Sequence, residues 1–317
     1  MPPESPASIP MSLLPGRQAG AQLHKTATGL RLLSLQNRFG CADILLQGAQ
    51  LLRWQPIGTH PLTWLSPEPE LLPQKSPHGG IPICWPWFGP HGDNPTLPAH
   101  GFARTADWSV HSIKRLHNGS HRLTLRLPSP PSPKSPRLTA CFTIGPDLTI
   151  ELTTLNSSNH PIIIGEALHT YFTVGDIRQV RVHGLNNQPY IDKTEAGILK
   201  RQRGAIRIHG ETDRVYVGSR SICTIEDPVL QRRIRIEKKG SNSTIIWNPW
   251  AEKSAAISDM GADAYLNMLC VESGNALQDQ VTVPPGAAHR LWVRYRLRDW
   301  KADADAAFST LTSQGGC

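Results

Sequence analysis

The chain has 317 residues, including 28 prolines, 26 glycines and six cysteines, and a formal net charge of +8. A positive charge suits anionic partners, but aromatic residues are not interleaved with the basic clusters around Lys200 and Arg233, as single-strand binders require. We therefore interpret these clusters as solvated strand faces and loops, and expect no nucleic-acid partner.

The first half of the chain is expected to form short strands, because it is rich in proline and shows no helical period longer than about three turns. We expect a meander of strands at 30–35, 41–46 and 51–54. A hairpin pairs 108–113 with 122–127, and a second pairs 138–144 with 148–155. The proline-rich tract 128–136 is expected to be a stiff, exposed loop.

The second half continues the strand pattern. One strand is expected over 162–172, with an apolar face and a second face on which small residues flank His169 and leave room above the sheet. Further strands are expected at 178–183, 205–208, 215–217, 221–226, 233–237, 243–247, 266–272 and 290–297, with a short helix at 251–258. Because all-β folds of this size often form one domain, we expect a single domain over 21–300, between a flexible segment 1–20 and a helical tail 301–317.

The segment 78–104 reads H-G-G-I-P-I-C-W-P-W-F-G-P-H-G-D-N-P-T-L-P-A-H-G-F-A-R and has no helical period. Its glycines and prolines keep it out of a central strand, and Trp85, Trp87 and Phe88 offer flat faces on which a sugar ring can stack. His100 and Arg104 lie four residues apart and share a face if the chain is extended. These features favour a pocket wall.

Five sequence blocks, in this order, resemble the hexose-6-phosphate mutarotases, a branch of the aldose 1-epimerase family. They are G-G-I-P-I-C-W-P-W-F-G with P-A-H-G-F-A-R, then A-L-H-T-Y-F, E-T-D-R-V-Y, W-N-P-W and M-L-C-V-E-S-G. The resemblance implies an all-β, galactose-mutarotase-like supersandwich of mostly antiparallel strands with a few short helices. It also implies interconversion of the α and β anomers of a hexose 6-phosphate.

The resemblance assigns roles to particular residues. Anomer interconversion opens a hemiacetal, for which one general acid and one general base suffice without a cofactor. Glu272 is expected to be the base and His169 the acid, with apolar neighbours such as Leu269 and Val271 raising the glutamate pKa. The alternative for His169 is a hydrogen-bonded histidine in the core, and the alternative for Glu272 is a strand-end carboxylate in solvent.

Substrate binding is expected from His78, Trp85, His100, Arg104 and Asp213. Arg104 suits a phosphate on C6 or ring hydroxyls, and Asp213 suits sugar hydroxyls, although it could also form a turn. A zinc site from Cys84, His91 and His100 matches no compact zinc motif, so we expect no metal.

Two positions depart from the family pattern. His78 stands where the family commonly has an arginine that helps hold the phosphate, and Ala99 stands where some members have a glutamine. Neither departure touches the acid–base pair, but they leave a mutarotase for unphosphorylated aldoses as one alternative. A second alternative is that the same fold serves as a non-catalytic carbohydrate-binding or regulatory module. A glycosidase would need two opposed carboxyl groups, and Glu272 alone is well placed.

The cysteines and the N-terminal segment indicate the cellular compartment of the protein. No C-x-x-C pair occurs, which suits reduced thiols in the cytoplasm. Residues 1–20 lack the basic start and apolar run of a secretory signal, and no run approaches the ~20 apolar residues of a membrane span. We expect a cytoplasmic monomer that acts on a sugar or sugar phosphate and has no membrane partner.

Overall fold

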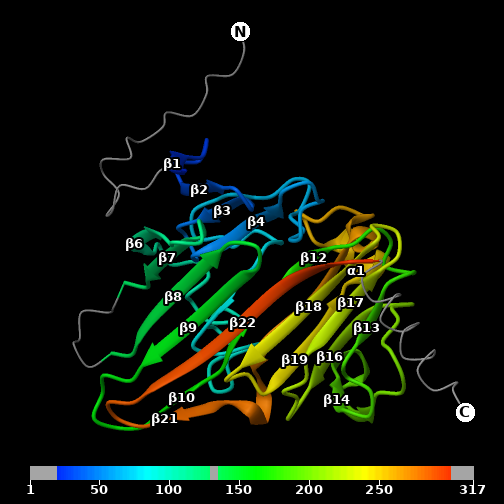
Figure 1. Cartoon of the computed structure of the whole chain (residues 1–317). Helices are drawn as coiled ribbons and strands as arrows, with labels where there is room; N and C mark the ends of the chain where they lie inside the picture. The colour runs from blue at the N-terminus through cyan, green and yellow to red at the C-terminus, as the bar shows by residue number, and fades with distance from the viewer. Residues whose placement is uncertain (1–19, 129–134, 301–317) are drawn as a thin grey trace, which may run out of the picture.

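A computed structural model describes residues 20–128 and 135–300 (Figure 1). The expectations for 1–19 and 301–317, and for most of the 128–136 loop, lie outside these ranges. Among the described residues, no helix is long and apolar enough to cross a membrane.

Two eight-stranded antiparallel sheets dominate the fold. The first, here called the β20 sheet, has the order β15 (Ile198–Arg201), β14 (Pro189–Asp192), β16 (Thr212–Tyr216), β19 (Ser243–Asn248), β20 (Met268–Asn275), β11 (Glu166–Leu168) and β5 (Ile83–Cys84), and β12 (Tyr171–Thr173) also pairs with β20. The second, the β22 sheet, has the order β13 (Arg181–His183), β17 (Cys223–Asp227), β18 (Arg232–Lys239), β22 (Ala288–Asp299), β9 (Leu148–Leu155), β8 (Arg137–Ile144), β7 (His121–Arg126) and β6 (Ser109–Arg115).

Smaller elements complete the structure. A four-stranded meander contains β1 (Ala21–Lys25), β2 (Arg31–Asn37), β3 (Gly40–Leu45) and β4 (Gln50–Pro56), and β10 (Ile162–Ile164) pairs with β21 (Val281–Val283). The helical elements are α1 (Trp250–Ala256) and the 3₁₀ turns η2 (Lys193–Glu195), η3 (Ala264–Asn267) and η4 (Leu277–Asp279). The predicted all-β, antiparallel class is confirmed.

The core lies between the two large sheets. In β9, alternate residues from Leu148 to Thr154 are buried, and Leu291, Val293 and Tyr295 of β22 are buried in the same way. These residues belong to one hydrophobic cluster with Val271 of β20. Side chains that alternate in this way bury one face of each sheet and leave the other face of each for solvent or ligands.

The predicted strand 162–172 is wrong as a single element, because it forms β10, β11 and β12. Its backbone leaves the sheet ladder to bond the loop from Gly80 to Pro86. The Gly165 N–H donates to the Pro86 carbonyl at 2.8 Å, and the His169 N–H donates to the Pro82 carbonyl at 3.0 Å. Tertiary hydrogen bonds that sequence periodicity does not reveal therefore divide the strand.

Other boundaries also differ from the predictions. The segment 205–208 forms only an isolated bridge from Ile206 to Val182, and residues 178–180 precede β13 rather than belonging to it. The start of the predicted strand 266–272 is occupied by η3, and the strand continues to Asn275. The sequence analysis predicted none of β1, β5, β14, β15 and β21, which are short or lack a run of β-branched residues.

The turn at His100 and Gly101 fixes the loop that leads to Arg104. Both residues have positive φ angles, 67° and 74°. A Cβ added to Gly101 would lie 2.0 Å from the Trp85 carbonyl oxygen, so this position excludes every other residue.

We predict that Gly101→Ala lowers the free energy of unfolding by about 3 kcal/mol or more, because strain at positive φ adds to a backbone clash. Gly58→Ala is a matched control: its φ is 71°, and no atom lies within 4 Å of the added Cβ. The control should lose only about 1 kcal/mol. Urea unfolding followed by circular dichroism measures both, and equal losses would contradict this account of the turn.

Candidate active site

The register of the β20 sheet brings His169 and Glu272 together. β11 and β12 pair with β20 in the same register, with Leu168 opposite Ser273 and Tyr171 opposite Cys270. The ladder is interrupted between them, and the residue opposite His169 is Glu272. His169 Nε2 lies 3.5 Å from Glu272 Oε1. The two residues predicted to be the acid and the base therefore face each other, although about a hundred residues separate them in the chain.

Both groups are buried. The Glu272 side chain is 1% exposed and the His169 side chain 13%. Glu272 Oε2 and His169 Nδ1 have no hydrogen-bond partner among the described residues. An unsatisfied buried polar atom costs about 1–3 kcal/mol, so this pair is poised to gain from a polar ligand.

Burial shifts the two pKa values in opposite directions, because each charged form loses hydration. The pKa of Glu272 is raised well above its usual value, first by burial and then by the nearby Asp213 carboxylate. The pKa of His169 is lowered well below its usual value by burial and then by the nearby His100 and Arg104. The direction for Glu272 agrees with the expectation, but Leu269 and Val271 are not the cause, because they point into the core between the sheets.

A cavity of about 240 Å³ opens over this pair. It includes four of the five predicted substrate-binding residues along with both catalytic candidates. Its lining residues are His78, Phe88, His100, Arg104, His169, Tyr171, Lys193, Asp213, Ile245, Trp247, Lys253 and Glu272. Side-chain alternation along the strands explains why these residues line the cavity. Positions 213, 245, 247 and 272 all point to the side of the β20 sheet that faces away from the core.

His100 presents a hydrogen-bond donor to the cavity. The Gly89 N–H donates to His100 Nδ1 at 3.3 Å, and the His100 N–H donates to the Gly89 carbonyl at 2.8 Å. Burial, followed by the charges of Arg104 and Lys193, lowers the pKa of His100 to about 3. The ring is therefore neutral near pH 7, and its remaining proton is on Nε2.

Arg104 lies beside His100 with its guanidinium partly exposed. Its Nη2 donates to the Ala99 carbonyl at 2.9 Å, and no carboxylate among the described residues lies within 4.0 Å of it. A guanidinium has five N–H donors, so most of those on Arg104 are left for a ligand. An anion at this end of the cavity would meet an uncompensated positive charge.

Asp213 lines the cavity from β16, which lies on the other side of β20 from β11 and β5 and thus from the loop that carries Arg104. Lys193 Nζ lies 3.8 Å from Asp213 Oδ2, and Lys253 Nζ donates to Glu211 at 2.7 Å. Burial raises the pKa of Asp213. Both lysines face carboxylates, so this end of the cavity is nearly balanced in charge, in contrast with the Arg104 end.

His78 is fixed by a buried carboxylate. Its Nδ1 lies 2.6 Å from Asp259 Oδ1, and its backbone N–H donates to Asp259 Oδ2 at 3.1 Å. The Asp259 side chain is 1% exposed, whereas that of His78 is 35% exposed. With Nδ1 committed to Asp259, Nε2 is the nitrogen that remains for the cavity.

The prediction that Trp85 stacks on substrate is wrong. Its side chain is 1% exposed in the core, and its Nε1 donates to Thr154 Oγ1 at 3.0 Å. Trp87 does not line the cavity either; its Nε1 donates to the Pro98 carbonyl. Phe88 lines the cavity and meets the His100 ring edge-on at 4.8 Å.

Sequence reasoning missed five other lining residues as site residues, namely Tyr171, Lys193, Ile245, Trp247 and Lys253. Tyr171 stacks on the His169 ring at 4.8 Å, and Trp247 packs edge-on against both rings. Lys193 and Lys253 come from η2 and α1. Tyr171 and Trp247 share the strand parity of His169 and Glu272 once the register is known, but nothing in the local sequence distinguishes the two lysines.

Cys84, His91 and His100, which the sequence analysis rejected as a zinc site, are not the potential ligands that the structure brings together. Among the described residues, His169, Cys270 and Glu272 place ligand atoms within 4.8 Å of one another. Burial raises the pKa of the Cys270 thiol well above its usual value, whereas metals bind the thiolate. We therefore assign no metal to this cluster.

Known proteins resemble this chain over most of its length. Residues 31–296 match the model of the aldose 1-epimerase family. A protein from Cenchrus ciliaris named "Putative glucose-6-phosphate 1-epimerase" is 35% identical over 286 residues, covering 85% of each chain. One of the same name from Salmonella typhimurium is 36% identical over 247 residues, covering 75% of this chain and 81% of that protein.

The fold also matches a solved structure. The crystal structure of a "putative mutarotase" from Salmonella typhimurium superimposes with a TM-score of 0.83 at 30% identity, covering 90% of this chain and 96% of that one. The chain therefore belongs to the aldose 1-epimerase family.

Proposed function

We propose that this enzyme interconverts the α and β anomers of a hexose 6-phosphate, with glucose 6-phosphate as the first candidate. The observation that carries the proposal is the buried pair of His169 and Glu272, 3.5 Å apart beneath an open cavity. The names of the relatives supply the candidate substrate.

The pair can move two protons without a cofactor. The Glu272 carboxylate takes the proton of the C1 hydroxyl while the His169 imidazolium protonates the ring oxygen, and the ring opens. The aldehyde then rotates about C1–C2. On ring closure the C5 hydroxyl returns its proton to His169, and Glu272 gives its proton to the carbonyl oxygen on C1, which leaves the other anomer and the starting protonation of both groups.

The opposed pKa shifts fit this cycle. After ring opening, Glu272 is protonated and His169 is neutral, and this uncharged arrangement is the one that burial favours. The two arrangements of the pair differ only in which group holds the transferable proton. The site therefore favours the open-chain state, which is the intermediate of the reaction.

The 6-phosphate is assigned to the Arg104 end of the cavity. If His169 protonates the ring oxygen, C6 projects from the neighbouring carbon on the same side as His169. The His100 ring meets the His169 ring edge-on at 5.8 Å, and Arg104 lies close enough to lower the pKa of His169. His78 lines the same cavity. We propose that Arg104 and His78 bind the phosphate, whereas Asp213 and His100 bind ring hydroxyls.

Location and assembly are also proposals. Cys41, Cys84, Cys141, Cys223 and Cys270 are free thiols, which supports a reducing compartment such as the cytoplasm. The monomeric state remains a prediction.

The first prediction tests the base. Glu272→Gln preserves the shape of the side chain but removes proton acceptance, so kcat should fall by about 10²–10⁴-fold with KM changed little. NMR exchange spectroscopy on glucose 6-phosphate measures the anomerisation rate. A variant with wild-type kcat would remove Glu272 from the mechanism and favour a binding module.

The second prediction tests phosphate recognition. Arg104→Ala should lower kcat/KM for glucose 6-phosphate by about tenfold or more, because a charge-assisted hydrogen bond is lost, and should change the value for glucose far less. Arg104→Lys keeps the charge and should recover part of the loss. Equal losses for the two sugars would favour the alternative, a mutarotase for unphosphorylated aldoses.

The third prediction concerns pH. The pair is active when His169 and Glu272 together hold one transferable proton. Activity therefore falls at low pH, where both groups are protonated, and at high pH, where neither group holds this proton. The Asp213 charge raises the pKa of Glu272 and the Lys193 charge lowers it. Asp213→Asn should therefore move the alkaline limb of kcat to lower pH, and Lys193→Gln should move it to higher pH.

Full pH profiles of both variants on glucose 6-phosphate check these directions. Comparison with the wild type on the same substrate cancels the titration of the phosphate itself. Shifts in the same direction for the two variants would exclude Glu272 as the group that titrates in the alkaline limb.

A further inference from the structure

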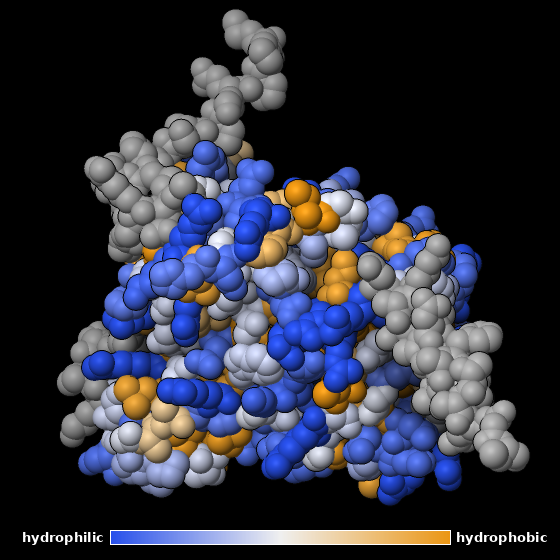
Figure 2. Space-filling view, in the orientation of Figure 1, coloured by the Kyte–Doolittle hydropathy of each residue, from blue (hydrophilic) through white to orange (hydrophobic). Residues whose placement is uncertain are grey.

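The outer face of the β22 sheet concentrates positive charge. Alternation buries Leu291 and Val293 and turns Arg290, Trp292 and Arg294 outward. The same alternation in the other strands gives twelve outward basic residues, here called the basic face: Lys114, Arg122, Arg126, Arg137, Arg181, Arg233, Arg235, Lys239, Arg290, Arg294, Arg296 and Arg298. Figure 2 shows hydrophilic residues gathered over the area that β8, β9, β22 and β18 occupy in Figure 1.

Few carboxylates balance this charge. The outward positions of the same strands carry three acidic residues, Glu151, Glu226 and Glu237. Asp147, in the turn between β8 and β9, binds Arg296, so twelve positive charges stand against four negative ones and leave +8, as much as the formal net charge of the whole chain. The outer face of this sheet is therefore strongly positive.

The available carboxylates are already shared. Glu226 lies 3.3 Å from Arg233 and 3.1 Å from His183, and Glu237 binds both Arg235 and Arg294. Within the described residues, seven members of the basic face have no carboxylate within 4.0 Å: Lys114, Arg122, Arg126, Arg137, Lys239, Arg290 and Arg298. An external anion would therefore not have to displace a carboxylate from these seven side chains, although Arg122 Nε already donates to Cys141 Sγ at 3.1 Å.

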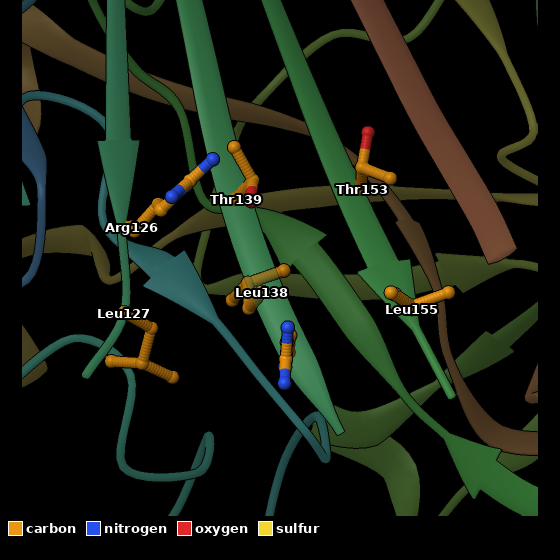
Figure 3. Close-up of a pocket in the computed structure, with 7 residues that line it drawn as sticks. Arg126, Leu127, Leu138, Thr139, Thr153 and Leu155 are labelled. Carbon is orange, nitrogen blue, oxygen red and sulfur yellow. The ribbon is translucent and has the colours of Figure 1, made fainter. Parts of the chain in front are cut away.

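A hollow of about 350 Å³ lies at one end of the basic face. Arg126, Arg137, Thr139 and Thr153 supply guanidinium and hydroxyl donors, and Leu127, Leu138 and Leu155 supply apolar surface. Figure 3 shows the Arg126 side chain extending from the end of β7 toward Thr139 of β8, with Leu155 on the next strand. Cationic and apolar groups side by side suit an amphipathic anion.

The sugar cavity does not account for this charge. The cavity lies on the side of the β20 sheet that faces away from the core, and the basic face lies on the side of the β22 sheet that faces away from the same core. The two surfaces are therefore on opposite sides of the sandwich. An anion bound to the basic face would leave the cavity open.

The arrangement fits a charged surface better than a nucleic-acid strand. The basic residues spread across eight strands, roughly 35 Å at the usual strand spacing, rather than along a single track. The ring of Trp292, near the centre, already contacts Lys239 Nζ at 5.6 Å and Arg294 Cζ at 5.7 Å, so its face is not free to stack a base. Tryptophan is also a residue that favours the headgroup level of a bilayer.

We propose that the basic face docks on a phospholipid bilayer that carries anionic headgroups. Each basic residue near such a surface adds electrostatic attraction, and salt weakens it. This proposal replaces the expectation of solvated strand faces and no membrane partner. The basic residues are scattered along the sequence, and the pairing of strands in the β22 sheet brings them onto one face.

The test is co-sedimentation of the full chain with large unilamellar vesicles. One set of vesicles contains phosphatidylcholine alone, and the other contains 30% phosphatidylglycerol. The wild type should pellet with the anionic vesicles at about 0.05 M NaCl, remain in solution with the neutral vesicles, and be released at about 0.5 M NaCl.

Two variants with the same net charge locate the surface. The face variant combines R122Q, R126Q, R137Q and R290Q, and the control combines R53Q, R201Q, R203Q and R207Q. All eight arginines are exposed and none lies within 4.0 Å of a described carboxylate. The face variant should bind anionic vesicles at least about tenfold more weakly than the wild type, and the control should bind much like the wild type.

Catalytic activity toward glucose 6-phosphate checks that each variant is folded, and the pair R126Q/R137Q is a milder substitute. Equal weakening by the face and control variants would overturn the proposal, because only net charge would matter. So would absence of wild-type binding to anionic vesicles. Tighter binding to a single-stranded oligouridine than to vesicles, through the same arginines, would also overturn it in favour of a nucleic-acid surface.

Discussion

The site depends on one antiparallel register. β11 and β12 continue the same pairing with β20, and the interruption between them falls at His169 and Thr170. There the backbone N–H of His169 bonds the Pro82 carbonyl instead of β20, while its side chain still faces Glu272. A shift of one residue in this pairing would send Glu272 into the core.

The second sheet helps to hold this interruption. Thr170 Oγ1 lies 2.7 Å from the hydroxyl of Tyr295, which projects from β22 across the core. Both side chains are buried, so neither can exchange this hydrogen bond for one with water. The bond ties the residue next to His169 to the opposite sheet, and the position of the imidazole therefore depends on how the two sheets pack.

The sequence predicted the fold class, and the family resemblance singled out His169 and Glu272, which the structure brings together, but neither indicated what surrounds the pair. Strand alternation indicated most strands of the β22 sheet because they are long and buried on one face. It failed for 162–172, where hydrogen bonds to the loop divide the chain, and for Trp85, whose flat ring packs in the core instead of the cavity. Lys193 and Lys253 reach the cavity from a 3₁₀ turn and a helix, and only the tertiary structure places them there.

His78 shows how a departure from the family pattern is accommodated. An imidazole carries fewer donors than the guanidinium commonly found in this position, so it can replace that group only if its orientation is fixed. Asp259 provides the orientation by accepting both from the backbone N–H of His78 and from Nδ1, and its own burial makes that contact hard to exchange for water. Because Nδ1 donates to Asp259, any contact of His78 with a phosphate must be made through Nε2, which can donate to a phosphate oxygen only when it also carries a proton. Our proposal therefore assigns phosphate recognition at this end mainly to the Arg104 guanidinium, with His78 in a supporting role.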